Sequence, residues 1–177
     1  MLKGYGRQDF QLGKGDRHVI TILLWIALIT GLVVSIFSLV EELCLSTACK
    51  DTASFTIFGV GMGWFGIAFF CFVLILLWLN KKVYGLDWVL AAIIFAGIGA
   101  EFRLLWIQKY IIGSWCPLCV TICCTMFSAG ILMLVERVHL AGSVRGRGKS
   151  LPVWMAFMAA MIAAGLAIAI VGVKALT

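Results

Sequence analysis

Five long and predominantly apolar stretches dominate this sequence, and each exceeds the roughly 18 residues that a membrane span requires. They extend from Val19 to Val40, from Phe55 to Leu79, from Trp88 to Ile112, from Trp115 to Val135 and from Leu151 to Ala175. Because 63% of the 177 residues are hydrophobic and only 12% are charged, no remaining segment has the composition of a soluble domain. We therefore expect an all-α integral membrane protein with five transmembrane helices, the first of which is too long to be the core of a removable signal peptide.

The distribution of positive charge predicts which ends of the helices face the cytoplasm, because cytoplasmic flanks hold an excess of Lys and Arg. Ten of the fourteen Lys and Arg residues flank one side of the expected spans: Lys3, Arg7, Lys14, Arg17, Lys81, Lys82, Arg137, Arg145, Arg147 and Lys149. This arrangement places the N-terminus inside and the C-terminus outside. Topology then explains the net charge of +6, which implies contact with membrane lipid and requires no nucleic-acid partner.

Two pairs of cysteines fall on the outer side of the membrane in this topology. Cys44 and Cys49 lie in the loop of residues 41–54, which is flexible enough for the two sulfurs to meet. Cys116 and Cys119 lie at the outer start of the fourth span, where residues three apart share a helix face and Pro117 suits the first turn. The spacing of the second pair is that of dithiol oxidoreductases, and compartments outside the cytoplasm favour disulfides. These four cysteines are therefore candidate catalytic residues.

The other three cysteines have different expected roles. Cys71, deep in the second span, and Cys124, off the face of the outer pair, are expected to pack as small hydrophobic residues. Cys123 lies one turn below Cys119 on the same helical stripe. Packing is its simplest role, but its position also makes it a candidate lining residue for whatever accepts the electrons.

Metal chemistry is the alternative function for the outer cysteines. Four thiolates can hold zinc, but zinc sites usually repeat a two-residue spacing and often include His, whereas His18 and His139 fall on the cytoplasmic side. A membrane carrier for a soft metal such as copper or mercury would pass the ion between cysteine ligands. Such a path requires ligands across the membrane, and only Cys123 continues below the outer pair. We therefore favour redox chemistry and expect no metal site.

The order of these motifs resembles that of the vitamin K epoxide reductase family, and especially of its bacterial members. The resemblance covers roughly residues 19–138 and rests on the loop cysteines, on Ser54 that follows them, on the glycine-rich segment from Phe58 to Gly66, and on Cys116-Pro117-Leu118-Cys119 followed by Val120-Thr121. The sequence departs from the pattern at Gly61, where bacterial relatives often have Pro, and at Cys123, where animal enzymes place a substrate-contacting Tyr. The second departure argues against epoxide reduction of the animal type.

The resemblance implies a domain plan and a reaction. Residues 1–18 would form a cytoplasmic segment, 19–138 a four-helix redox core with the outer loop 41–54, 139–150 a basic cytoplasmic loop, and 151–177 a fifth transmembrane helix. The implied activity is that of a thiol:quinone oxidoreductase of the bacterial cytoplasmic membrane, which generates disulfides by oxidising an extracytoplasmic thioredoxin-like protein and reducing ubiquinone or menaquinone. Many bacterial relatives continue into a thioredoxin-like domain, whereas this sequence stops at Thr177, so we expect that partner to be a separate protein.

The resemblance also implies roles for individual residues. Cys49 would form the mixed disulfide with the external partner, and Cys44 would close on it. Cys44 would then attack Cys116, and the released Cys119 would pass the electron pair to quinone. Ser54 would orient the loop or bond to a quinone oxygen, the alternative being that it caps the second span.

Glu101 lies in the third span, about 16 Å from its outer end at ~1.5 Å rise per residue. Ionisable groups at such a depth are functional candidates by default. Glu101 is therefore either a cofactor-binding residue of a quinone pocket or a carboxyl group that pairs with another helix or is protonated. Arg103, two residues further on, does not face Glu101, and we expect its side chain to extend outward.

Overall fold

The computed structural model describes residues 9–44, 55–57, 59–80, 82, 85–113, 115–143 and 151–175. Its long helices are α1 (Asp9–Cys44), α3 (Met62–Asn80), α4 (Leu86–Ile107), α5 (Pro117–Ser143) and α6 (Leu151–Gly172). The last turn of the α4 helix widens into a π-helical segment, η1 (Gln108–Ile112). Each of the five helices contains a segment long and apolar enough to cross a membrane. The prediction of a helical protein with five possible spans is therefore confirmed.

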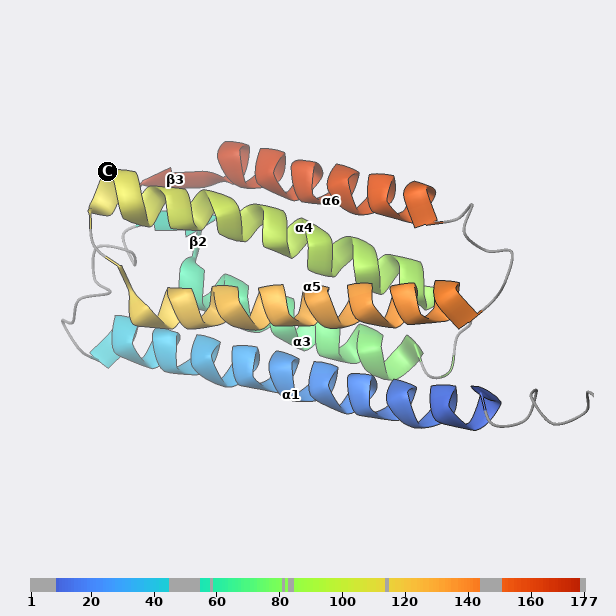
Figure 1. Cartoon of the computed structure of the whole chain (residues 1–177). Coiled ribbons are helices and arrows are strands. Elements are labelled where there is room, and N and C mark those ends of the chain that lie inside the picture. Colours follow the sequence, from blue (N-terminus) through green and yellow to red (C-terminus); the bar gives the residue numbers. More distant parts are fainter. Residues whose placement is uncertain are drawn as a thin grey trace, which may run out of the picture.

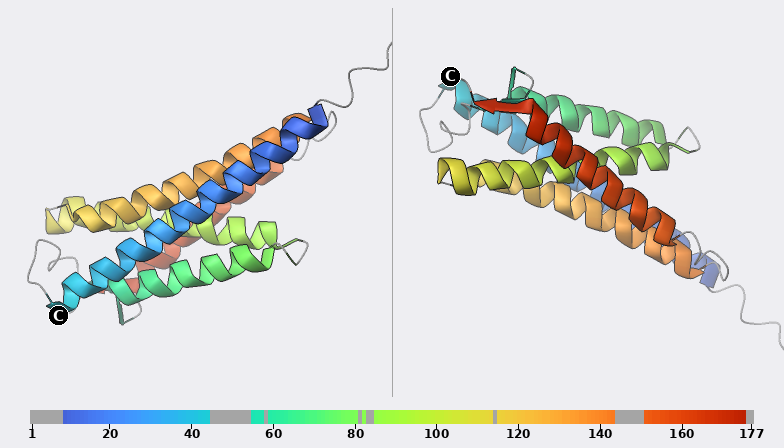
Figure 2. Two further views of the ribbon diagram at one scale, coloured as in Figure 1. Left: turned by 90° about the horizontal axis from the view of Figure 1, so that it is seen from below. Right: turned by 90° about the horizontal axis from the view of Figure 1, so that it is seen from above.

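The helices lie side by side along one common direction (Figure 1). The two views of Figure 2 and the contacts between elements agree that α1 packs against α5 and α3, whereas α4 packs chiefly against α6 and also against α5. Because an odd number of long helices alternates in direction, α1 begins at one end of the molecule and α6 finishes at the other. Many large apolar side chains point outward from all five helices, as expected for helices surrounded by lipid.

A small antiparallel sheet closes one end of the molecule, which we call the sheet end. It contains β1 (Phe55–Ile57), β2 (Val60–Gly61) and β3 (Val173–Ala175) in the order β2-β1-β3. In its register Thr56 is opposite both Gly61 and Lys174. Gly59 forms the turn of the hairpin with φ +82°, a conformation that side chains rarely allow. The strand that precedes α3 is thereby joined to the strand that follows α6.

These strands correct the expected limits of two spans. The second span was expected from Phe55 but begins at Met62, and the fifth was expected to reach Ala175 but ends at Gly172. An apolar segment with β-branched residues suits a strand as well as a helix, and hydropathy does not distinguish the two. Because α3 begins at Met62, Ser54 is not its N-cap. The structure also extends α1 as far as Cys44, which was expected in the loop.

The hydrophobic core occupies the half of the molecule away from the sheet end. All five helices contribute to it, and its buried side chains include Leu28, Phe70, Ile94, Met126 and Trp154. A cavity lies closer to the sheet end on the same helices.

Helices α4 and α6 approach each other closely. A Cβ atom added at Gly99 would overlap the carbonyl oxygen of Ile162, and one added at Gly165 would overlap the carbonyl oxygen of Ala96. Two glycines thus allow backbone to contact backbone, which is a common way to pack helices in a membrane. This contact fixes the position of α6 against α4.

Candidate functional site

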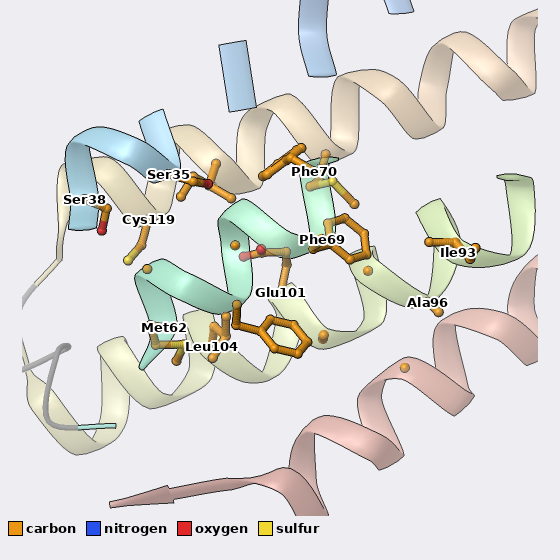
Figure 3. Close-up of a pocket in the computed structure, with 18 of the residues that line it drawn as sticks. Ser35, Ser38, Met62, Phe69, Phe70, Ile93, Ala96, Glu101, Leu104 and Cys119 are labelled. Atoms are coloured by element: carbon orange, nitrogen blue, oxygen red, sulfur yellow. The ribbon is translucent and has the colours of Figure 1, made fainter. Parts of the chain in front are cut away.

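A cavity of about 250 Å³ lies in the sheet half of the molecule, and all five long helices contribute to its wall. Most of the wall is apolar, and its polar side chains are Ser35, Ser38, Glu101 and Cys119. Cys119 lies at one end of the cavity, the Glu101 carboxylate lies near the middle, and Ile93 lies toward the other end (Figure 3). The cavity therefore combines an apolar enclosure with one thiol, one carboxyl group and two hydroxyls.

The start of α5 positions the cysteines of the Cys-Pro-Leu-Cys motif. The carbonyl of Cys116 accepts the backbone N–H of Val120 at 3.1 Å, and Pro117 is the first helical residue, as its missing N–H allows. Cys116 therefore stands just before the helix, where it is 2% exposed. Cys119, one turn later, faces the cavity.

The two cysteines of this motif are in different redox states. Cys116 is disulfide-bonded, whereas Cys119 carries a free thiol. The disulfide of Cys116 is therefore not the one that would close the small ring with Cys119. The cavity wall therefore carries the free thiol of Cys119, three residues after the oxidised sulfur of Cys116.

The chain approaches Cys116 through the π-helical turn η1. The N–H of Gly113 donates to the carbonyl of Gln108 at 2.9 Å, and Gly113 adopts φ +74°. A residue with a side chain would be strained in that left-handed conformation. This turn reverses the chain within a few residues, so that the end of α4 and the start of α5 lie next to each other.

Gln108 is a site residue that the sequence analysis missed. Its side chain is 1% exposed, and its amide lies close enough to the Cys119 sulfur to form a hydrogen bond. Its Oε1 atom has no hydrogen-bond partner within the described residues. A buried amide with an unused acceptor is unusual, because such groups are costly unless satisfied. The sequence does contain a signal for Gln108 as a site residue, because it is a polar residue two helical turns after Glu101 on the same face of an apolar span.

The carboxylate of Glu101 interacts electrostatically with both Cys119 and Cys123. No hydrogen bond or ion pair joins Glu101 to another residue in the described ranges, so the alternative of a carboxyl paired with another helix finds no support there. Arg103 points elsewhere, because its guanidinium group lies 4.5 Å from the ring centroid of Trp106. Glu101 is thus a carboxyl group that faces the cavity without a hydrogen-bond or ion-pair partner among the described residues.

Two serines of α1 complete the polar part of the wall, and neither was predicted. Ser35 is fully buried and its hydroxyl donates to the carbonyl of Gly31 at 2.9 Å, which leaves its oxygen free to accept. A side chain at Gly66 of α3 would press on this hydroxyl, since an added Cβ would be 2.9 Å from it. The spacing of Ser35 and Ser38, one helical turn, places both on the face of α1 that borders the cavity.

The remaining candidates fall outside the cavity or outside the described residues. Cys123 is buried and is not among the residues that line this cavity. Cys71 and Cys124 are exposed free thiols on the surfaces of their helices. The side chain of Cys44, and Cys49 and Ser54 as a whole, lie outside the described residues. Among the described residues, no group of three or more His, Cys, Asp or Glu side chains is arranged to hold a metal ion.

The site therefore rests on its own geometry and on the motifs in the sequence. No family model, no curated protein and no solved structure matches this chain.

Proposed function

We propose that this chain is a thiol:quinone oxidoreductase of a bacterial cytoplasmic membrane, which oxidises a thioredoxin-like protein outside the membrane and reduces a membrane quinone. One observation carries the proposal: Cys116 is in a disulfide, while Cys119 is a free thiol on the wall of an apolar cavity. A relay requires this arrangement after its first exchange, because the sulfur nearest the acceptor must be released as the other is attacked.

In the proposed relay, the loop cysteines carry electrons from the partner to the motif. The loop disulfide oxidises the partner's dithiol through Cys49, which leaves Cys44 and Cys49 reduced. Cys44 then attacks Cys116 and releases Cys119. The free thiols of Cys71, Cys119, Cys123 and Cys124 support this assignment, because none of them is the disulfide partner of Cys116.

The remaining steps restore the loop disulfide and transfer two electrons and two protons to the quinone. Cys49 attacks Cys44, which restores the loop disulfide and leaves Cys116 and Cys119 as a dithiol. Closing the disulfide between Cys116 and Cys119 then releases two electrons and two protons. When bound, a quinone accepts these two electrons and two protons and becomes a quinol. Each cycle thus converts one dithiol of the partner into one disulfide.

The cavity fits the ring of a quinone in size and in chemistry. Its volume of about 250 Å³ is slightly below the roughly 300–1,000 Å³ of typical ligand pockets, which suits one substituted ring. Aromatic side chains such as Phe65 and Phe69 offer flat apolar contacts, and Glu101 with the serine hydroxyls offers partners for ring oxygens. We assign to Glu101 the further role of holding a proton next to Cys119, because no protein group competes for its carboxylate in the described ranges.

The proposal includes a topology in which the sheet end faces outward. Helices α1, α3, α4 and α5 would form the redox core, and α6 would be the additional fifth helix. Lys82 and Arg137 support this orientation, because both lie toward the opposite end and both contact tryptophans. Lys82 is 4.2 Å from the ring of Trp78, and Arg137 is 5.6 Å from the ring of Trp88. Lys and Arg are in excess at the cytoplasmic face of a membrane, whereas tryptophans gather at both faces, so the orientation rests on the basic residues.

The test is anaerobic reduction of quinone by the purified full-length protein, with a reduced thioredoxin-fold protein as donor. We expect one donor disulfide for each quinol formed. Cys119→Ser should abolish turnover, and Cys71→Ser, on the exposed face of α3, is the matched control that should retain it. Quinone reduction that persists in Cys119→Ser would refute the assignment. Cysteine-dependent transport of copper(I), without any quinone reduction, would favour the metal carrier instead.

A further inference from the structure

The cavity opens toward the lipid-facing surface where α3 and α6 border it. Among its lining residues only Phe65 of α3 and Ile168 of α6 are exposed, at 39% and 57%. We propose that this opening, the α3–α6 portal, holds the apolar tail of a lipophilic quinone whose ring lies inside the cavity. This inference rests on the proposed function. It adds the path by which the quinone enters, and it assigns to the fifth helix a contact with the quinone tail.

The packing of the helices explains why the opening lies there. Helix α6 runs along α4 and α3 runs along α1, while α3 and α6 hardly touch over their described residues. The right view of Figure 2 shows α3 and α6 diverging from the end that carries β3. The pairing of β1 with β3 joins the two helices at this end. Helices α3 and α6 are therefore joined at the sheet end and lie further apart along their membrane-spanning parts.

Two other helix interfaces that border the cavity, α4–α6 and α1–α3, are closed by close contacts. Gly99 and Gly165 bring the backbones of α4 and α6 together. Between α1 and α3, a Cβ atom at Gly31 would overlap the ring of Phe70, and Gly66 packs against Ser35. A ligand that enters from the bilayer here would have to separate the backbones of α4 and α6, or move the packed side chains between α1 and α3. The α3–α6 portal requires no such movement.

The size and polarity of the cavity indicate what must occupy the portal. About 250 Å³ holds a ring but not also a long hydrocarbon chain, so the tail of a membrane quinone must leave the cavity. The portal residues Phe65 and Ile168 are both apolar, and beyond them lies the surface that lipid covers. A tail placed here stays in apolar surroundings along its whole length.

The test is photolabelling of the purified full-length protein in lipid nanodiscs, with a dimethoxy-benzoquinone that bears a decyl tail and a diazirine on that tail. Labelled positions are identified by mass spectrometry of peptides. We expect labels on α3 around Phe65 and on α6 around Ile168, and competition by the same benzoquinone without a tail. Ile168→Trp, which fills the opening with a larger side chain, should reduce this labelling at least fivefold.

Ile170→Trp is the matched control. Ile170 is 52% exposed on the same helix, does not line the cavity, and lies about 200° around the helix axis from Ile168. This variant should leave the labelling unchanged. In turnover assays, Ile168→Trp should raise the KM for the tailed quinone at least fivefold without changing the KM for the tail-less one, a difference that a general loss of structure would not produce.

The outcomes separate this inference from the proposed function. If the tail-less ring competes with labelling but the labels lie between other helices, the portal inference is wrong and the proposed oxidoreductase function still stands. A photoreactive phosphatidylcholine is the lipid control. If it labels Phe65 and Ile168 and the tail-less ring does not displace it, the opening holds ordinary lipid, and the portal inference is overturned. Absence of any ring-competable labelling would overturn the acceptor site itself, and the portal with it.

Discussion

Replacing Gly99 by Ala tests whether the backbone contact between α4 and α6 holds the fifth helix in place. The added Cβ would overlap the carbonyl oxygen of Ile162 and would lie 2.9 Å from the carbonyl carbon of Ile162 and 2.9 Å from the amide nitrogen of Leu166, where ordinary contacts are 3.4–4 Å. All three atoms belong to the backbone, so no rotamer change relieves the overlap. Helix α6 must therefore move away by at least half an ångström.

The cost of that movement can be worked out from general magnitudes. A gap of about 0.5–1 Å forfeits a quarter to a half of each dispersion contact along the seam. Overpacking typically costs about 1–3 kcal/mol, and the gain from replacing a helical Gly by Ala is about 0.5–1 kcal/mol. Because a rigid backbone is the obstacle, we take the upper part of the range and expect a net loss of about 2 kcal/mol.

The assay is thermal unfolding of the purified protein in detergent, followed by the loss of tryptophan fluorescence. Gly130→Ala is the control, because its Cβ would meet the end of a flexible side chain, Cδ1 of Ile98, at 2.6 Å. We expect a clear fall in Tm for Gly99→Ala and a smaller one for Gly130→Ala. Equal or greater stability of Gly99→Ala would refute the reasoning, since it would mean that α6 is not held by this contact.

Three further predictions concern the site. Gln108→Leu should slow alkylation of Cys119 by N-ethylmaleimide at fixed pH by roughly tenfold or more, because the thiolate loses a charge-assisted hydrogen bond. The rate is measured by peptide mass spectrometry, and an unchanged rate would contradict the contact between Gln108 and Cys119. Glu101→Gln should lower the rate of quinone reduction by roughly a hundredfold, since proton transfer by a positioned group contributes about a hundredfold to a rate. The rate of thiol exchange with the donor should stay unchanged. Equal losses in both half-reactions would argue that Glu101 has a structural role. Cys71→Ser and Cys124→Ser should each keep full turnover, and inactivity of either would require a path for electrons that the cavity does not include.

Hydropathy was sufficient to predict the five helices, because a bilayer-length apolar run has few alternatives to a helix. The same property failed at Phe55–Ile57 and Val173–Ala175, where short apolar segments form strands. Their pairing joins segments more than a hundred residues apart, and no local pattern in either one specifies the other. Helix limits near a membrane surface are therefore the part of the fold that sequence predicts least well.

The site was predictable where a single residue carried the signal. Cys119 and Glu101 stand out as a thiol with redox spacing and as a charge within a span, and both line the cavity. Gln108 and Ser35 were missed because uncharged polar residues occur in many spans, and their importance depends on which neighbours the fold brings to them. The portal was not predictable either, because it depends on how closely α3 and α6 approach, which packing elsewhere decides.

The pairing of β1 with β3 has a consequence for biosynthesis. The ribosome makes β3 more than a hundred residues after β1, so at ~5–20 residues per second the first strand waits on the order of ten seconds for its partner. During that interval β1 can pair only with its hairpin neighbour β2. Newly made chains therefore pass through a stage in which α3 is not yet joined to α6 at the sheet end, and synthesis of the last strand ends it.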